Sequence, residues 1–78
     1  MQSYIFRVVV EPDEDRWLAY VPELESRGAV SWGNTRDEAL RNIQEVAHMV
    51  VEELLADNEE LPAGVTKGDE PAVAVNIG

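Results

Sequence analysis

Residues 11–15 contain a cluster of acidic side chains. Carboxylate oxygens are the ligands that hard metal cations prefer. Glu11, Asp13, Glu14 and Asp15 all fall in this stretch. It lacks the glycine and the distal glutamate of a calcium-binding loop, and Pro12 stiffens it. The pattern therefore favours a solvated hairpin tip over a metal site.

A metal-dependent nuclease would need carboxylates from separate elements to converge on two metal ions. Glu11 falls on the more polar face of its predicted strand, and the helix acids fall on the polar face of their helix, so they share no centre. The single histidine, His48, has no evident nucleophile or orienting group, which a general base needs. We therefore expect a protein that is not an enzyme, with no catalytic residue, no metal and no cofactor.

The stretch from Gly33 to Leu55 is predicted to form a turn, a helix cap and one long amphipathic helix. Thr35 and Glu38 form a capping-box pattern, in which the hydroxyl accepts from the Glu38 N–H and the carboxylate accepts from the Thr35 N–H. Apolar residues then recur at helical spacing: Ala39, Leu40, Ile43, Val46, Ala47, Val50, Val51, Leu54 and Leu55. So broad a stripe suits a helix that lies across a sheet.

The polar side of this helix supplies candidate contacts with a partner or a second subunit. Glu45, Glu52 and Glu53 lie on that side, and Met49 falls in its middle, where an apolar side chain contributes little to a soluble monomer. Single exposed apolar residues are nevertheless common on monomers. Trp32 is a further candidate because tryptophan is enriched at binding hot spots. Core packing is the favoured prediction for both tryptophans.

Alternation of apolar and polar residues predicts the sheet that the helix covers. Three segments with this pattern precede the helix: residues 3–11, 16–21 and 28–32. A turn is predicted over residues 12–15 and a short polar connection over 23–27. The three segments are expected to pair as antiparallel strands.

The chain after the helix is predicted to contain a mobile connection over residues 57–71, which is rich in proline and glycine, and a terminal strand over 72–77. That strand could pair with the first strand through a right-handed crossover, or add to the sheet edge of a neighbouring subunit. The sequence leaves both open. It predicts one α+β domain over residues 1–78, with a three-stranded antiparallel sheet, one long helix and a C-terminal strand (β-β-β-α-β).

The composition is strongly acidic, with sixteen acids, six bases and a formal net charge of −10. Such a surface repels a nucleic-acid backbone and attracts a basic protein, although it would also serve solubility alone. A 78-residue chain without cysteine has a small core and no disulfide, so we expect a homodimer or higher oligomer. Neither a signal peptide nor a membrane span is apparent, which favours a cytoplasmic protein.

The sequence resembles the HicB-like antitoxin family over residues 4 to about 55. The second family motif, Gly-Asp-Thr-x-x-Glu-Ala, is matched by Gly33-Asn34-Thr35-Arg36-Asp37-Glu38-Ala39. The first motif, Pro-Asp-Leu-Pro-Gly, is matched in part by Pro22-Glu23-Leu24, with Glu25-Ser26-Arg27 ahead of Gly28. The resemblance implies a partly degraded ribonuclease-H-like fold that acts by binding.

Family members typically mask the active site of a small basic ribonuclease toxin of the HicA type. The resemblance therefore implies an antitoxin of a toxin–antitoxin system. The alternative is an orphan oligomeric domain that has no toxin and a structural or unknown role. Many members also carry a DNA-binding region after this domain, whereas the residues after the helix here are acidic and contain one lysine, Lys67.

We therefore predict that the protein does not bind DNA. Incubation with a random DNA duplex at physiological salt should give no gel shift, because the acidic surface offers few cations to replace the counterions of the phosphates. A clear shift would contradict this expectation.

Overall fold

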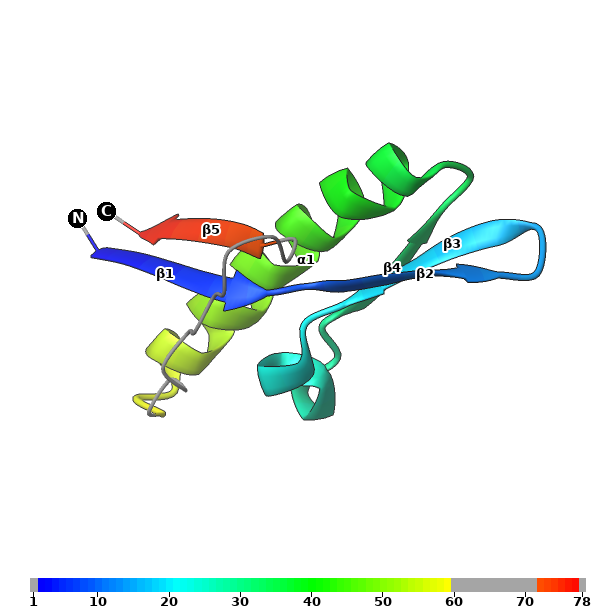
Figure 1. The fold of residues 1–78 in the computed structure, drawn as a ribbon. Helices are drawn as coiled ribbons and strands as arrows, with labels where there is room; N and C mark the ends of the chain where they lie inside the picture. The colour runs from blue at the N-terminus through cyan, green and yellow to red at the C-terminus, as the bar shows by residue number, and fades with distance from the viewer. Residues whose placement is uncertain (1, 60–71, 78) are drawn as a thin grey trace.

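The computed structural model describes residues 2–59 and 72–77 of the chain. The elements follow in the order β1 (Gln2–Arg7), β2 (Val9–Asp13), β3 (Arg16–Tyr20), the 3₁₀ helix η1 (Pro22–Arg27), β4 (Val30–Gly33), α1 (Arg36–Ala56) and β5 (Ala72–Ile77). The helix crosses the strands obliquely, and both ends of the chain lie side by side at one end of the molecule (Figure 1). The predicted α+β class, with a three-stranded antiparallel sheet, one long helix and a C-terminal strand, is confirmed.

The first predicted strand is interrupted. One strand was expected over residues 3–11, but it separates at Val8 into β1, which pairs with β5, and β2, which pairs with β3. Val8 itself is buried in the core. A strand that must follow two partners over its length bends between them, and the buried valine marks that bend.

The first hairpin is tighter than expected. Pro12 and Asp13 belong to β2, where they pair with Trp17 and Arg16, so the turn contains only residues 14–15. Glu14 has a φ of 58°, in the left-handed region. Two-residue turns with positive φ match the twist of the flanking strands, which explains why this short loop is used.

The register of β2, β3 and β4 assigns each side chain to one face, because residues directly opposite each other share a face. The inward rows are Val10–Ala19–Ser31 and Pro12–Trp17–Gly33. The outward rows are Val9–Tyr20–Val30 and Glu11–Leu18–Trp32. The helix packs on the inward face, where Ala19 is fully buried.

The core lies between α1 and the inward side of the strands. Its largest fully buried side chains are Phe6, Leu24 and Ile43, followed by four valines from the strands, the helix and the connections beside them. Leu24 belongs to η1, in a segment that the sequence predicts as a polar connection. This prediction is wrong because the 3₁₀ turn points Leu24 inward, while its neighbours Glu25 and Arg27 stay exposed.

The terminal strand pairs with the first strand of its own chain. β5 is antiparallel to β1, with Phe6 opposite Val73 and Tyr4 opposite Val75. Of the two alternatives that the sequence leaves open, the structure shows pairing with the first strand of the same chain. Of the predicted connection over 57–71, residues 60–71 lie outside the described residues.

Two side-chain amides of the helix bind strands of the sheet. Asn42 Nδ2 donates to the Trp32 carbonyl of β4 at 2.7 Å, and Gln44 Nε2 donates to the Ala74 carbonyl of β5. In the described part of the chain, β4 and β5 each pair with one strand only. Each amide therefore supplies a donor from the helix to a carbonyl of a strand that has one partner strand.

Gly33 allows the close approach between the end of β4 and the start of α1. A Cβ atom on this residue would lie 2.4 Å from the Ala39 nitrogen and 2.8 Å from the Glu38 carbonyl carbon, both backbone atoms that cannot move independently. Gly33→Ala is therefore expected to lower the free energy of unfolding by about 1–3 kcal/mol, measured by urea denaturation.

Gly28→Asn is the matched control for this variant. Gly28 has a φ of 89°, and nothing lies within 4 Å of a Cβ placed on it. Asparagine tolerates this conformation, so stability should change little. Equal stability of Gly33→Ala and the wild type would contradict the proposed contact.

Candidate protein-binding surfaces

The exposed side of α1 carries an apolar side chain surrounded by carboxylates. Met49 is 59% exposed. Glu45, Glu52 and Glu53 occupy the positions one helical turn before and after it, and all three are exposed. We call these four residues the Met49 patch. Such a patch can bury the flexible methionine against a partner while its carboxylates bind basic groups at the rim.

The charges near the C-terminal end of α1 destabilise the helix. Its last turn contains no basic residue, whereas Glu53 lies in it and Asp57 follows as the C-cap. Backbone carbonyls give this end of a helix a partial negative charge, so nearby carboxylates destabilise it. A cationic group from another molecule would offset this repulsion.

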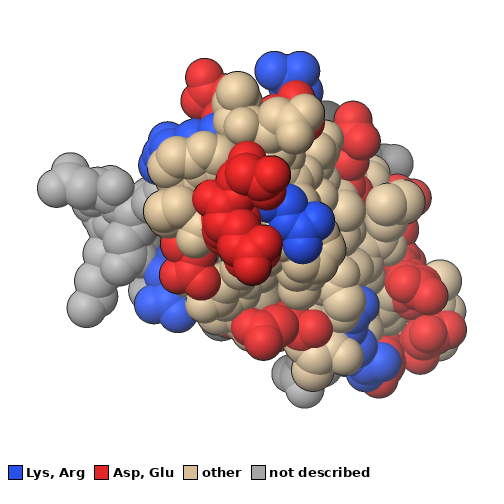
Figure 2. Space-filling model, turned by 90° about the vertical axis from the view of Figure 1, so that its right-hand side faces the viewer, with Lys and Arg blue, Asp and Glu red and all other residues tan. Residues whose placement is uncertain are grey.

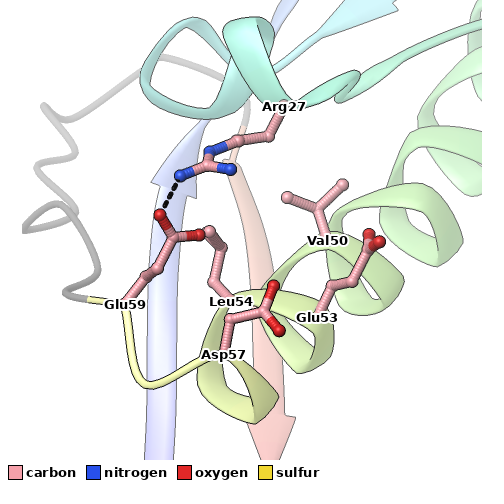
Figure 3. A pocket seen from close by; sticks show the side chains of 6 residues that line it. All are labelled: Arg27, Val50, Glu53, Leu54, Asp57 and Glu59. Carbon is pink, nitrogen blue, oxygen red and sulfur yellow. Dashed lines mark hydrogen bonds and ion pairs between the residues drawn. The ribbon is translucent and has the colours of Figure 1, made fainter.

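A pocket of about 130 Å³ opens beside the same helix end (Figure 3). It is lined by Arg27, Val50, Glu53, Leu54, Asp57 and Glu59. Arg27 reaches from η1 and donates to the Glu59 carboxylate, which ties η1 to the turn after α1. Three carboxylates and one guanidinium thus line the pocket, which therefore keeps a net negative charge that suits a further cation. No local pattern could have predicted this pair, because its members lie 32 residues apart.

Trp32 lies on the outward side of the sheet, and the predicted core packing is wrong for this residue. It is 40% exposed and pairs with Leu18 in an outward row, whereas Trp17 lies in an inward row and packs against the core. Its Nε1 donates to Asp13 Oδ2 at 3.2 Å. The Arg16 guanidinium stacks 4.7 Å from its ring centroid and lies 3.6 Å from the same carboxylate oxygen.

The candidate contacts from the sequence therefore separate into two surfaces. The Met49 patch lies on the helix, while Trp32 lies on the face of the sheet that the helix does not cover. The end view in Figure 2, onto the hairpin side of Figure 1, shows acidic groups in several places and fewer basic ones. An acidic surface is thus not confined to one element.

The remaining sequence candidates have local roles. Thr35 Oγ1 accepts from the Glu38 N–H at 3.0 Å, and Glu38 Oε1 accepts from the Asn34 N–H at 3.2 Å, one residue earlier than expected. His48 Nε2 lies 2.9 Å from Glu52 Oε1, so the histidine adjoins the Met49 patch. All three contacts join groups within the helix or at its start.

Within residues 2–59 and 72–77, no three histidine, cysteine or acidic side chains lie close enough together to hold a metal ion. The hairpin carboxylates illustrate why, since Asp13 is engaged by Arg16 and Trp32 while Glu14 and Asp15 are exposed in the turn. In the same part of the chain, no helix is long and apolar enough to cross a membrane.

Comparison with known proteins defines the class of fold. No family model matches the chain. The structure is similar to the crystal structure of the N-terminal domain of the Burkholderia pseudomallei antitoxin HicB, with a TM-score of 0.67, 22% identity, and coverage of 95% of this chain and 98% of that one. It also matches the longer HicB crystal structure with a TM-score of 0.59 and 22% identity, covering 99% of this chain and 64% of that one. The predicted HicB-like fold is confirmed.

A curated relative identifies the family. The chain is 42% identical over 53 residues to the UPF0150 protein of Helicobacter pylori strain J99. The matched residues make up 68% of this chain and 71% of that protein. The chain therefore belongs to the UPF0150 family.

The unfavourable charge at the end of α1 can be tested by a single substitution. Glu53→Gln should raise the free energy of unfolding by about 0.3–1 kcal/mol at low ionic strength, because it removes a negative charge from the negative end of the helix. Urea denaturation measures the change. Glu45→Gln, which removes the same charge from mid-helix, should have little effect; an equal gain from both would point to net charge alone.

Proposed function

We propose that this protein is an antitoxin that binds and masks a small basic ribonuclease of the HicA type. The observation that carries the proposal is the HicB antitoxin fold combined with an acidic, electrostatically unfavourable end of its one long helix. The chain is a binding protein and not an enzyme, and its partners are proteins rather than nucleic acids or membranes. Its setting is the cytoplasm, where a ribonuclease toxin would act.

The Met49 patch is the proposed toxin-binding surface. A net charge of −10 speeds the encounter with a basic protein, and this attraction weakens as salt screens it. On contact, Met49 loses its exposure to water, and basic side chains pair with Glu52, Glu53 and the pocket carboxylates. The repulsion at the helix end is thereby offset, so part of the binding free energy comes from relief of an unfavourable charge in the free protein.

The masking itself is steric. A bound antitoxin of this size lies over the active-site surface of an equally small ribonuclease and excludes RNA. No chemical step on the antitoxin is required.

Self-association without a toxin is the second candidate function. The exposed Trp32, held by Asp13 and Arg16 on the outward face of the sheet, favours it. A homodimer is compatible with either function, so the recovery of a toxin distinguishes them.

The first experiment is a pull-down of the tagged protein from its own cells at low and high salt. We expect a small basic protein at low salt, less of it at high salt, and ribonuclease activity once it is separated. Recovery of only the protein itself would favour the oligomeric function.

The binding surface is tested by charge reversal. The double variant Glu52→Lys/Glu53→Lys should weaken toxin binding at least tenfold and restore RNA cleavage in a mixture with the toxin, because both carboxylates belong to the Met49 patch. The control Asp15→Lys/Glu25→Lys makes the same change in net charge at exposed positions elsewhere. Equal weakening by both pairs would show that net charge, and not this patch, determines binding.

A further inference from the structure

We propose that a second copy of this chain docks on the outward face of the sheet. This outer sheet face comprises the outward positions of β1 to β4, and its apolar part is formed by Ile5, Val9, Leu18, Tyr20, Val30 and Trp32. The inference rests on the self-association included in the proposed function and assigns it a surface. It does not depend on a toxin.

The apolar part of this face is continuous across three strands. Val9, Tyr20 and Val30 form one row, and Leu18 and Trp32 lie side by side in the next. Ile5 extends the face along β1 and is 49% exposed. Adjoining apolar side chains on one open face release more water on association than scattered ones do.

The centre of the face is also rigid before binding. Trp32 is held from one side by its hydrogen bond to Asp13 and from the other by the stacked Arg16 guanidinium, and these two residues pair with each other. A fixed aromatic ring loses little side-chain entropy on docking. Trp32 therefore has the properties of a binding hot spot.

Charge selects a second copy over the basic partner for this face. The whole chain has sixteen acids against six bases, so two copies repel each other over most of their surfaces. On the outer sheet face, Arg7 and Arg16 balance Glu11 and Asp13. Two copies can approach here without net repulsion, whereas a basic toxin would gain more at the Met49 patch.

The sheet edges favour docking by faces rather than by strand addition. Asn42 and Gln44 already donate to carbonyls of β4 and β5. Each of these carbonyls already has a donor from the helix, so it is less available to a strand that a second copy would add. The outer sheet face requires no such exchange.

Docking through the outer sheet face leaves the Met49 patch free. The helix lies on the inward face of the sheet, so the Met49 patch of each protomer points away from the dimer interface. Toxin binding and self-association therefore do not compete.

Sedimentation velocity at increasing protein concentration tests the proposal. We expect a dimer whose dissociation constant falls several-fold between 50 and 500 mM NaCl, because salt screens the repulsion between two acidic chains. Trp32→Ser should raise that constant at least tenfold, while Met49→Ser, which changes an even more exposed apolar side chain on the helix, should leave it unchanged. Leu18→Gln serves as the second variant if Trp32→Ser fails to fold by circular dichroism.

A measurement on the unmodified protein complements the variants. Acrylamide quenching of tryptophan fluorescence should decrease as concentration rises, because the dimer covers Trp32. A monomer at 200 µM, a dimer that survives both face variants, or a dimer lost with Met49→Ser would each overturn the proposal. Failure to recover a toxin would refute only the antitoxin function, since sedimentation is independent of it.

Discussion

The close packing of α1 against the sheet is the contact on which the rest of the structure depends. Small residues make it close: Gly33 leaves no room for a side chain beside Ala39, and Ala19, Ala39 and Ala47 are fully buried. Because the helix and the sheet lie so close together, their side chains make many dispersion contacts and exclude water. The close packing also brings Asn42 within hydrogen-bonding distance of the Trp32 carbonyl in β4, so the contact that forms the core also ties the helix to this strand.

This two-layer packing also separates two kinds of surface. The helix side presents Met49 among carboxylates, and one of them, Glu53, lies in the last turn of α1, where a negative charge costs stability and would suit a basic partner. The sheet side presents Trp32 among apolar residues with balanced charge. The two surfaces differ in charge, and each has one exposed apolar side chain near its centre, as the two proposed interactions require.

Much of the fold could be predicted from the sequence because its signals are local. Helical spacing from Ala39 to Leu55 and the Thr35–Glu38 pattern lie within a few turns of one helix, and the observed helix covers Arg36–Ala56. The tight motif from Gly33 to Ala39 carried the family resemblance. Of the candidate contacts, Met49 proved the most exposed large apolar side chain in the described residues, because its place on the polar arc follows from helix geometry alone.

By itself, the sequence determined the β-β-β-α-β order of the main elements, the cap of α1 and the acidic character of its exposed side, but not η1 or the division of the first strand into β1 and β2. Only the tertiary structure decided the break at Val8, the antiparallel pairing of β5, the Arg27–Glu59 pair and the outward position of Trp32. The physical reason is the range of the interactions. A strand changes face with every residue, so the register against β3, which is set by the whole sheet and the helix beneath it, determines whether Trp32 enters the core or faces outward.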